Sequence, residues 1–313
     1  MTRSPLRIVT RESPLAMWQA NHVREGLLRL YPDLEVTLIG VKTEADQFQE
    51  RTLLSMGGKG AFVKELEAVL LSGRADLAVH SMKDVTVEIP PDLELPVILK
   101  RHDPGDAFVS NDYACIDDLP AGAGVGTSSP RRRCQLKHYR PDLQISDIRG
   151  NVGTRLKKLD EGQYDALILA VAGLERLELQ HRITARIPAT QLLPAIGQGA
   201  LGVEIRKGDA NVLSLLKALD DAETHACVAA ERAVSRRLDC GCLAPLAGYA
   251  VIEGGQLHLS ALIGRPDGSG VIRGEIGGSV REAETLGDRL GLDLLNRGAG
   301  DILREIREHE QQQ

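Results

Sequence analysis

A run of polar residues, His80-Ser81-Met82-Lys83-Asp84, follows the apolar stretch from Leu77 to Val79. That stretch has the length and composition of a buried parallel strand, so the polar run stands at the strand's carboxyl end. Ligands of open α/β sheets bind at such ends. A hydroxyl, an ammonium and a carboxylate gathered there could form a reaction centre. Asp84 could accept a hydrogen bond from a developing N–H cation or carry a proton; capping of the following turn is the alternative.

Two Ser-Pro pairs, Ser13-Pro14 and Ser129-Pro130, each precede a helical pattern. Serine is a favoured N-cap and proline a favoured first helical residue. The free N–H groups and the dipole of a helix start attract anions, whereas arginines there oppose the dipole. We therefore expect an anion between Arg131 and Arg132, with a solvated basic helix start as the alternative. The residues around both starts that could hold an anion are Arg11, Ser13, Thr127, Ser128, Ser129, Arg131 and Arg132.

Two further loops carry reactive side chains. Gly57-Gly58-Lys59-Gly60 lacks the spacing of a nucleotide-binding loop, so it presents Lys59 on a mobile loop or is a plain turn. Cys240-Gly241-Cys242 is rich in glycine and follows two arginines, which favour a reactive thiolate. A zinc site is the alternative for this region, and its ligands would be His225, Cys227, Cys240 and Cys242.

Composition excludes several classes of protein. The 313 residues carry a net charge of −6, which argues against a general nucleic-acid binder. No apolar run reaches the roughly 18–20 residues that span a bilayer, and the N-terminus has no signal-like segment. Five cysteines without an export signal indicate reduced thiols and a cytoplasmic location. The stretch 125–186 holds 12 Lys+Arg against 7 acids, so a basic middle stands in an acidic chain and suggests an anion site.

The elements that must position these residues occur in two similar copies. In each, a strand, a Ser-Pro helix start, a Pro-Asp-Leu turn and a second strand follow one another, from residues 7–41 and from 124–148. Alternating strands and helices predict two α/β modules. After Cys242 the pattern changes to hairpins and two helices. We expect a first lobe from residues 1–99 and 200–219, a second from 100–199, and a C-terminal α+β domain from 220–313.

In these motifs the chain resembles the porphobilinogen deaminase family, also called hydroxymethylbilane synthases. The resemblance runs from Arg7 to about Glu308. Its most specific stretches are Gly57-Gly58-Lys59-Gly60, His80-Ser81-Met82-Lys83-Asp84, Gly126-Thr127-Ser128-Ser129-Pro130-Arg131-Arg132, Ile148-Arg149-Gly150-Asn151-Val152-Gly153-Thr154-Arg155 and Pro194-Ala195-Ile196-Gly197-Gln198-Gly199.

The resemblance implies an α/β fold with two periplasmic-binding-protein-like lobes plus a smaller C-terminal α+β domain. It implies a monomeric, cytoplasmic transferase that binds neither nucleic acid nor membrane and condenses four porphobilinogen molecules, with loss of ammonia, on a covalently bound dipyrromethane. Water then releases linear hydroxymethylbilane. The family match places the cofactor thioether on Cys242.

The resemblance also implies a role for each matched residue. Asp84 would be the essential carboxylate and would stabilise the cationic reacting pyrrole, and Lys59 would belong to a loop over the cleft between the lobes. Lys83 and Arg11 would act beside Asp84. The residues implied to hold cofactor and substrate carboxylates are Arg11, Ser13, Ser81, Lys83, Thr127, Ser128, Ser129, Arg131, Arg132, Arg149, Arg155 and Arg176.

The chain departs from the family pattern at Cys240, where glycine is usual, and at Thr86, where proline is usual. A second thiol two residues from Cys242 could compete for the dipyrrole. Two other functions remain open: a two-lobed binding protein for a small polycarboxylate, and a zinc-dependent transferase.

Overall fold

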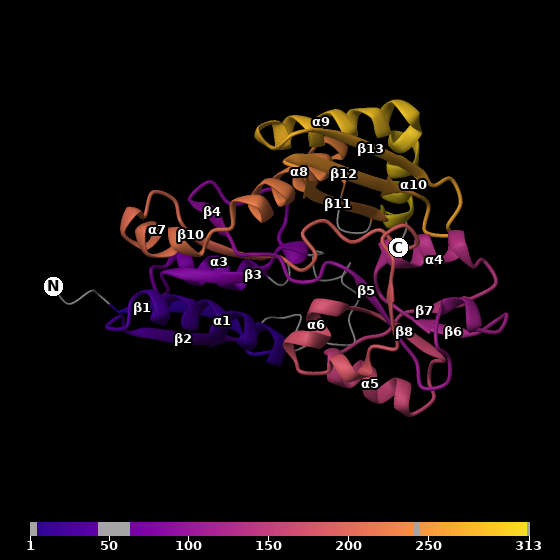
Figure 1. Cartoon of the computed structure of the whole chain (residues 1–313), viewed down its shortest axis with the longest axis horizontal. Helices are drawn as coiled ribbons and strands as arrows, with labels where there is room; N and C mark the ends of the chain where they lie inside the picture. The colour runs from indigo at the N-terminus through magenta and orange to yellow at the C-terminus, as the bar shows by residue number, and fades with distance from the viewer. Residues whose placement is uncertain (1–4, 43–62, 241–243, 312–313) are drawn as a thin grey trace. The chain divides into compact units, whose positions relative to one another are not determined.

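The computed structural model describes residues 5–42, 63–240 and 244–311 (Figure 1). The chain divides into two compact units, one from Met1–His102 and Ala200–His225, the other from Asp103–Gly199 and Ala226–Gln313. The second unit contains two sheets, each with its own hydrophobic core. The three-domain division at residues 99/100, 199/200 and 219/220 stays a prediction. Among the described residues, no helix combines the length and apolar character needed to span a membrane.

The first unit is built on a five-stranded sheet in the order β2-β1-β3-β10-β4. Its strands are β1 (Leu6–Arg11), β2 (Val36–Val41), β3 (Leu77–Ser81), β4 (Leu93–Ile98) and β10 (Leu201–Arg206). β1, β2 and β3 are parallel, and β10 runs antiparallel to β3 and β4. Helices α1 (Pro14–Leu30) and α7 (Ala210–Leu216) share one core with the strands, and α3 (Lys64–Leu71) another. Burial of both faces explains why the central strands β1, β3 and β10 are rich in apolar residues.

The lobe in the second unit repeats this plan, with a sheet in the order β7-β6-β8-β5-β9. Its elements are β5 (Asp106–Val109), β6 (Gly124–Gly126), α4 (Pro130–Tyr139), β7 (Gln144–Ser146), α5 (Val152–Asp160), β8 (Ala166–Ala170), α6 (Val171–Arg176) and β9 (Ala185–Ile187). β6, β7 and β8 are parallel, and β5 runs antiparallel to β8 and β9. Strand by strand, β7-β6-β8-β5-β9 matches β2-β1-β3-β10-β4. The internal repeat predicted from the sequence is therefore a repeat of topology.

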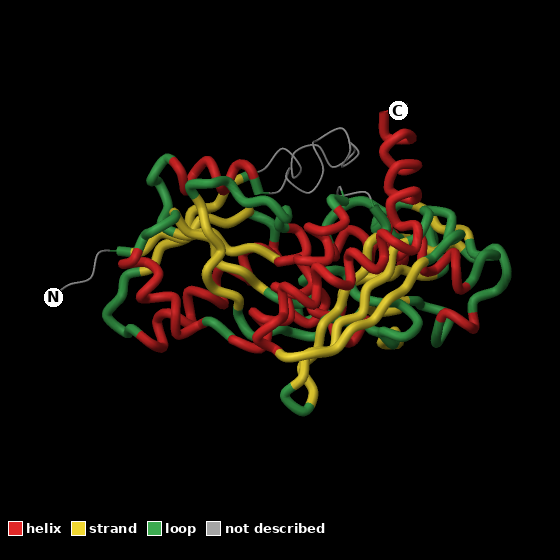
Figure 2. Tube along the Cα trace, turned by 90° about the horizontal axis from the view of Figure 1, so that it is seen from above, coloured by secondary structure: helices red, strands yellow, loops and turns green. Residues whose placement is uncertain are grey.

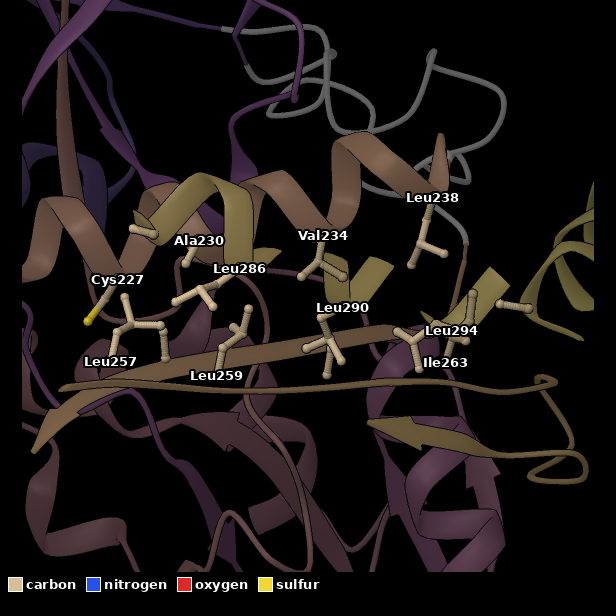
Figure 3. Close-up of a cluster of buried hydrophobic side chains, with 14 of the residues drawn as sticks. Cys227, Ala230, Val234, Leu238, Leu257, Leu259, Ile263, Leu286, Leu290 and Leu294 are labelled. Carbon is tan, nitrogen blue, oxygen red and sulfur yellow. The ribbon is translucent and has the colours of Figure 1, made fainter. Parts of the chain in front are cut away.

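The C-terminal part forms the predicted hairpins, β11 (Leu246–Glu253), β12 (Gln256–Ile263) and β13 (Ile272–Ser279), in one antiparallel sheet (Figures 1 and 2). The helices of this part are α8 (Ala222–Leu238), α9 (Ala283–Leu294) and α10 (Gly300–Gln311). Figure 3 shows side chains of α8 and α9 meeting those of β12 in a shared apolar core. Helices α8 and α9 approach each other closely at Gly287, where an added Cβ would collide with the carbonyl oxygen of Ala230.

One helix prediction is wrong in part. The sequence predicts helix from Asp209 to about Leu238, but the structure breaks it into α7, a 3₁₀ turn (Lys217–Leu219) and α8. Two aspartates explain the break. Asp220 accepts a hydrogen bond from the backbone N–H of Ile98 at 2.8 Å, and Asp221 accepts one from that of Thr224 at 2.9 Å. A side chain that caps the next helix ends the pattern locally.

Candidate active site

In the first lobe, the carboxyl ends of β1 and β3 lie side by side because the two strands pair in parallel. Ser13 caps α1 and accepts a hydrogen bond from the N–H of Ala16 at 3.4 Å. After β3 the chain makes a 3₁₀ turn (Met82–Asp84). The structure thus brings five predicted site residues to one edge of this sheet, and each is partly exposed: Arg11, Ser13, Ser81, Lys83 and Asp84.

His80, in contrast, turns into the core of the first lobe. It shares its face of β3 with Ala78, which packs in the same core cluster as Leu66 and Leu70 of α3. His80 Nε2 lies 2.8 Å from Glu204 Oε2 on β10, and their side chains are only 5% and 1% exposed. Sequence reasoning missed Glu204, because its partner lies 124 residues away and nothing local marks the pairing.

β10 also fixes the turn that carries Lys83 and Asp84. The N–H of Met82 donates to the carbonyl oxygen of Ala200 at 3.0 Å. Gly202 on β10 pairs with His80, and a Cβ at Gly202 would collide with the Met82 sulfur. Contacts to β10 therefore define the backbone from which Asp84 projects.

In the second lobe, strands β6, β7 and β8 are parallel, so their carboxyl ends meet at one edge. Helices α4 and α5 begin at that edge, capped by the side chains of Ser129 and Asn151. The predicted anion-binding residues follow these three strands. After β6 come Thr127, Ser128, Ser129, Arg131 and Arg132; after β7, Arg149 and Arg155; after β8, Arg176.

The hydroxyl groups before α4 also organise the backbone. Ser128 Oγ donates to the carbonyl oxygen of Ile148 at 2.6 Å and accepts from its N–H at 3.0 Å. Thr127 Oγ1 accepts from the N–H of Ser129 at 3.3 Å, and Ser129 Oγ accepts from that of Arg132 at 3.4 Å. The two bonds between Ser128 and Ile148 hold the segments after β6 and β7 together.

An anion does lie between Arg131 and Arg132, and the protein supplies it. Asp106 at the start of β5 is fully buried, and its carboxylate accepts from Arg131 Nη1 at 2.7 Å and from Arg132 Nη2 at 2.6 Å. Burial acts to raise the pKa of Asp106, but the charges and hydrogen bonds of the two arginines outweigh it and hold that pKa well below its usual range. Asp106 stands at this edge because β5 is antiparallel to β8 and pairs its first residue with Ala170, the last of β8.

The other three arginines make different contacts. Arg149 lies 3.7 Å from Asp147 in a partly exposed ion pair, and Arg155 Nε donates to the carbonyl oxygen of Gly150 at 2.8 Å. Arg176 is buried, and its Nη2 donates to the carbonyl oxygen of Gly199 at 2.7 Å. Burial lowers the pKa of Arg176 to about 10, so it stays charged at neutral pH.

Two predicted residues, Lys59 and Cys242, lie outside the described residues. Cys240 is half-buried, and its sulfur lies 3.6 Å from Ser235 Oγ. Within the described segments, no three His, Cys, Asp or Glu side chains cluster as metal ligands. A cavity of about 610 Å³ lies between the end of α4 and the C-terminal sheet, lined by residues that include His138, Leu262 and Arg273. Of the predicted site residues that the structure describes, none lines this cavity.

The fold is that of a two-lobed α/β protein with a small C-terminal sheet-and-helix part, and arginine and hydroxyl side chains follow the parallel strands of its sheets. Residues 6–214 match the family described as porphobilinogen deaminase, dipyromethane cofactor binding domain. Residues 225–296 match the porphobilinogen deaminase C-terminal domain. The chain therefore belongs to the porphobilinogen deaminase family, whose members are transferases of tetrapyrrole biosynthesis.

Solved structures similar to this chain include two bacterial proteins. One is the BvgS VFT2 domain of Bordetella pertussis, with 20% identity over 72% of this chain and 91% of that chain and a TM-score of 0.43. The other is a nutrient-binding protein of Burkholderia cenocepacia bound to methionine, with 15% identity over 70% and 93% and a TM-score of 0.44.

Proposed function

We propose that this protein condenses four porphobilinogen molecules head to tail and releases hydroxymethylbilane. In each condensation the aminomethyl carbon of porphobilinogen loses ammonia and bonds to the free α-carbon of the growing chain, which gives up its proton. The family match over both domains supports this reaction. The structural observation that carries it is the gathering of five arginines after three parallel strands of one sheet: Arg131, Arg132, Arg149, Arg155 and Arg176.

The substrate's charge explains why such a site needs arginine. Each pyrrole ring carries an acetate and a propionate, so the longest chain brings about a dozen carboxylates into the site, and these are costly to desolvate without cations. Guanidinium groups bind carboxylates in bidentate fashion. We assign the carboxylates to these arginines, with Arg11 and Lys83 and the hydroxyls of Ser13, Ser81, Thr127, Ser128 and Ser129.

The donor set fits a dipyrromethane cofactor, which carries carboxylates of the same kind. Arg131 has a buried Nε atom without a hydrogen-bond partner among the described residues, so this N–H group could donate to a ligand carboxylate. The cofactor, held by a thioether to Cys242, would supply the pyrrole α-carbon to which the first porphobilinogen is joined. Asp84 would accept hydrogen bonds from pyrrole N–H groups and stabilise positive charge beside them. Lys59 would belong to a loop that covers the bound substrate.

The intact mass of the denatured, purified protein tests this function. The expected mass exceeds that of the bare chain by one dipyrromethane, and the loaded protein consumes porphobilinogen. The bare mass in a protein shown not to be apo-protein, together with reversible binding of polycarboxylates, would instead identify a two-lobed binding protein.

A matched pair of serine variants tests the attachment. Cys242→Ser is expected to carry no dipyrrole, whereas Cys240→Ser is expected to carry it fully. Dipyrrole bound to Cys242→Ser would move the attachment to Cys240. Stoichiometric zinc in the purified protein would support the zinc-dependent transferase. We also propose a monomeric, cytoplasmic enzyme, which its sedimentation and the fractionation of its source cells would test.

A further inference from the structure

The Asp106 carboxylate joins three segments of the second unit. Besides Arg131 and Arg132 of α4, it accepts a hydrogen bond from Gln198 Nε2 at 3.0 Å. The same Gln198 atom donates to the carbonyl oxygen of Pro104 at 2.6 Å. Asp106 and Gln198 are 0% and 1% exposed, so these bonds form away from water. The start of α4 is therefore linked by hydrogen bonds to the segment at Pro104–Asp106, where the lobe begins in the sequence, and to Gln198, where it ends.

The charges of this cluster do not cancel. Arg131 and Arg132 bring two positive charges to a helix start, where the dipole is already positive. They are 4% and 6% exposed, so solvent screens them little. One carboxylate compensates one of the two charges. The cluster thus retains one net positive charge beside the predicted ligand hydroxyls.

Arg132 shows how firmly the carboxylate fixes geometry. Its Nε and Nη2 both donate to Asp106 Oδ1, at 3.0 and 2.6 Å, and its Nη1 donates to the carbonyl oxygen of Ile168 at 2.8 Å. Arg131 Nη1 donates both to Asp106 Oδ2 and to the carbonyl oxygen of Leu193, each at 2.7 Å. Both guanidinium planes are therefore set before any ligand arrives.

We propose that Asp106 is a positioning residue for carboxylate binding: it holds Arg131 and Arg132 at the buried start of α4 and leaves there the net charge for one ligand carboxylate. This inference rests on the proposed function. A guanidinium held in place loses less freedom on binding than one that must be recruited from solvent. Without Asp106, two adjacent buried cations would repel each other, and at least one would turn away from its binding position.

Asp106→Asn is the central variant, because asparagine keeps the shape and one acceptor oxygen but removes the charge. Asp142→Asn is the matched control. Asp142 pairs with Arg140 at the other end of α4, at 2.7 Å, but its side chain is 36% exposed. Folded monomer of each variant is isolated by size-exclusion chromatography. The measurements are the fraction that carries dipyrromethane, by intact mass, the melting temperature, and KM and kcat for porphobilinogen.

We expect folded Asp106→Asn to carry the dipyrrole at least 10-fold less often than wild type, and its loaded fraction to show a raised KM. Asp142→Asn is expected to match wild type in both. A purely structural Asp106 would lower the melting temperature and leave loading and KM of the folded monomer unchanged, which would overturn the proposal. A larger dipyrromethane-carrying fraction in Asp106→Asn than in wild type would also overturn the proposal, because the Asp106 charge would then merely repel the ligand.

Asp106→Glu covers the case in which Asp106→Asn yields no folded protein. Glutamate keeps the charge and displaces both guanidinium groups by one methylene, so we expect loading reduced several-fold in the folded monomer. Wild-type loading and KM in Asp106→Glu would refute a positioning role. A wild-type protein without any dipyrrole would refute the proposed function instead, so the two failures are distinguishable.

Discussion

The buried His80–Glu204 pair makes a quantitative prediction about the backbone that carries Asp84. Replacing His80 with leucine substitutes an apolar side chain of similar size and leaves the Glu204 carboxylate, 1% exposed, without its partner at 2.8 Å. Breaking a buried pair by removing one member costs about 3–5 kcal/mol. Glu67 of α3 adds to this cost, since burial and then the Glu204 charge already raise the pKa of Glu67. We therefore expect the free energy of unfolding to fall by about 3–5 kcal/mol at neutral pH.

Denaturant unfolding followed by circular dichroism measures this loss, and two controls interpret it. The double variant His80→Leu/Glu204→Leu removes the stranded charge and is expected to recover most of the lost stability, because apolar replacements of buried pairs are often neutral. Glu161→Gln removes one member of an exposed pair with Lys157 and is expected to change stability by less than about 0.5 kcal/mol.

A loss below about 1 kcal/mol at neutral pH would refute the reasoning that His80 and Glu204 form a coupled, desolvated pair.

Three further predictions concern the other residues described above. Asp84→Ala is expected to fold with wild-type stability and lose turnover in a porphobilinogen-consumption assay; near-normal turnover would remove Asp84 from the reaction. Gly287→Ala is expected to lower stability by about 1–3 kcal/mol in chemical unfolding, because its Cβ meets the backbone of α8, and an unchanged midpoint would contradict this close packing. The arginines hold the pKa of Asp106 below its unfolded value, so the ionised carboxylate contributes fully to the free energy of unfolding above about pH 4 and loses this contribution as pH falls through the folded pKa. Stability should therefore fall more steeply with acid in wild type than in Asp106→Asn. Parallel acid-unfolding curves would argue against this contribution.

Local signals in the sequence predicted local features of the structure. The Ser-Pro pairs predicted the capped starts of α1 and α4, and the pattern after Cys242 predicted hairpins; the β11–β12 hairpin turns at Gly254 and Gly255, which have positive φ (57° and 78°). Arg11 and Ser81 are the last residues of β1 and β3, which places both at the carboxyl edge of the sheet. Each of these features depends on a few neighbouring residues, so its signal is present in the sequence itself.

Partners that meet across the fold could not be predicted in this way. The sequence argument expected an anion between Arg131 and Arg132 but did not identify Asp106, 25 residues before Arg131, as a carboxylate that bonds to both. Glu204 reaches His80 only because β10 enters the sheet antiparallel beside β3. Single buried acids of this kind have no periodicity or spacing to mark them, and only the strand order brings them to their partners.

The position of β10 has a consequence for how the chain matures during synthesis. β10 lies between β3 and β4, yet its residues follow the whole of the second lobe in the sequence. During synthesis on the ribosome, the sheet of the first unit therefore stays incomplete until β10 has been made. Strands β5 to β9 of the later lobe are continuous in the chain, so that lobe's sheet can form first. We expect this to reverse the usual amino-terminal-first order of domain folding. Until Leu201–Arg206 emerges, we expect β3 and β4 to have unpaired edges at which the nascent chain can aggregate.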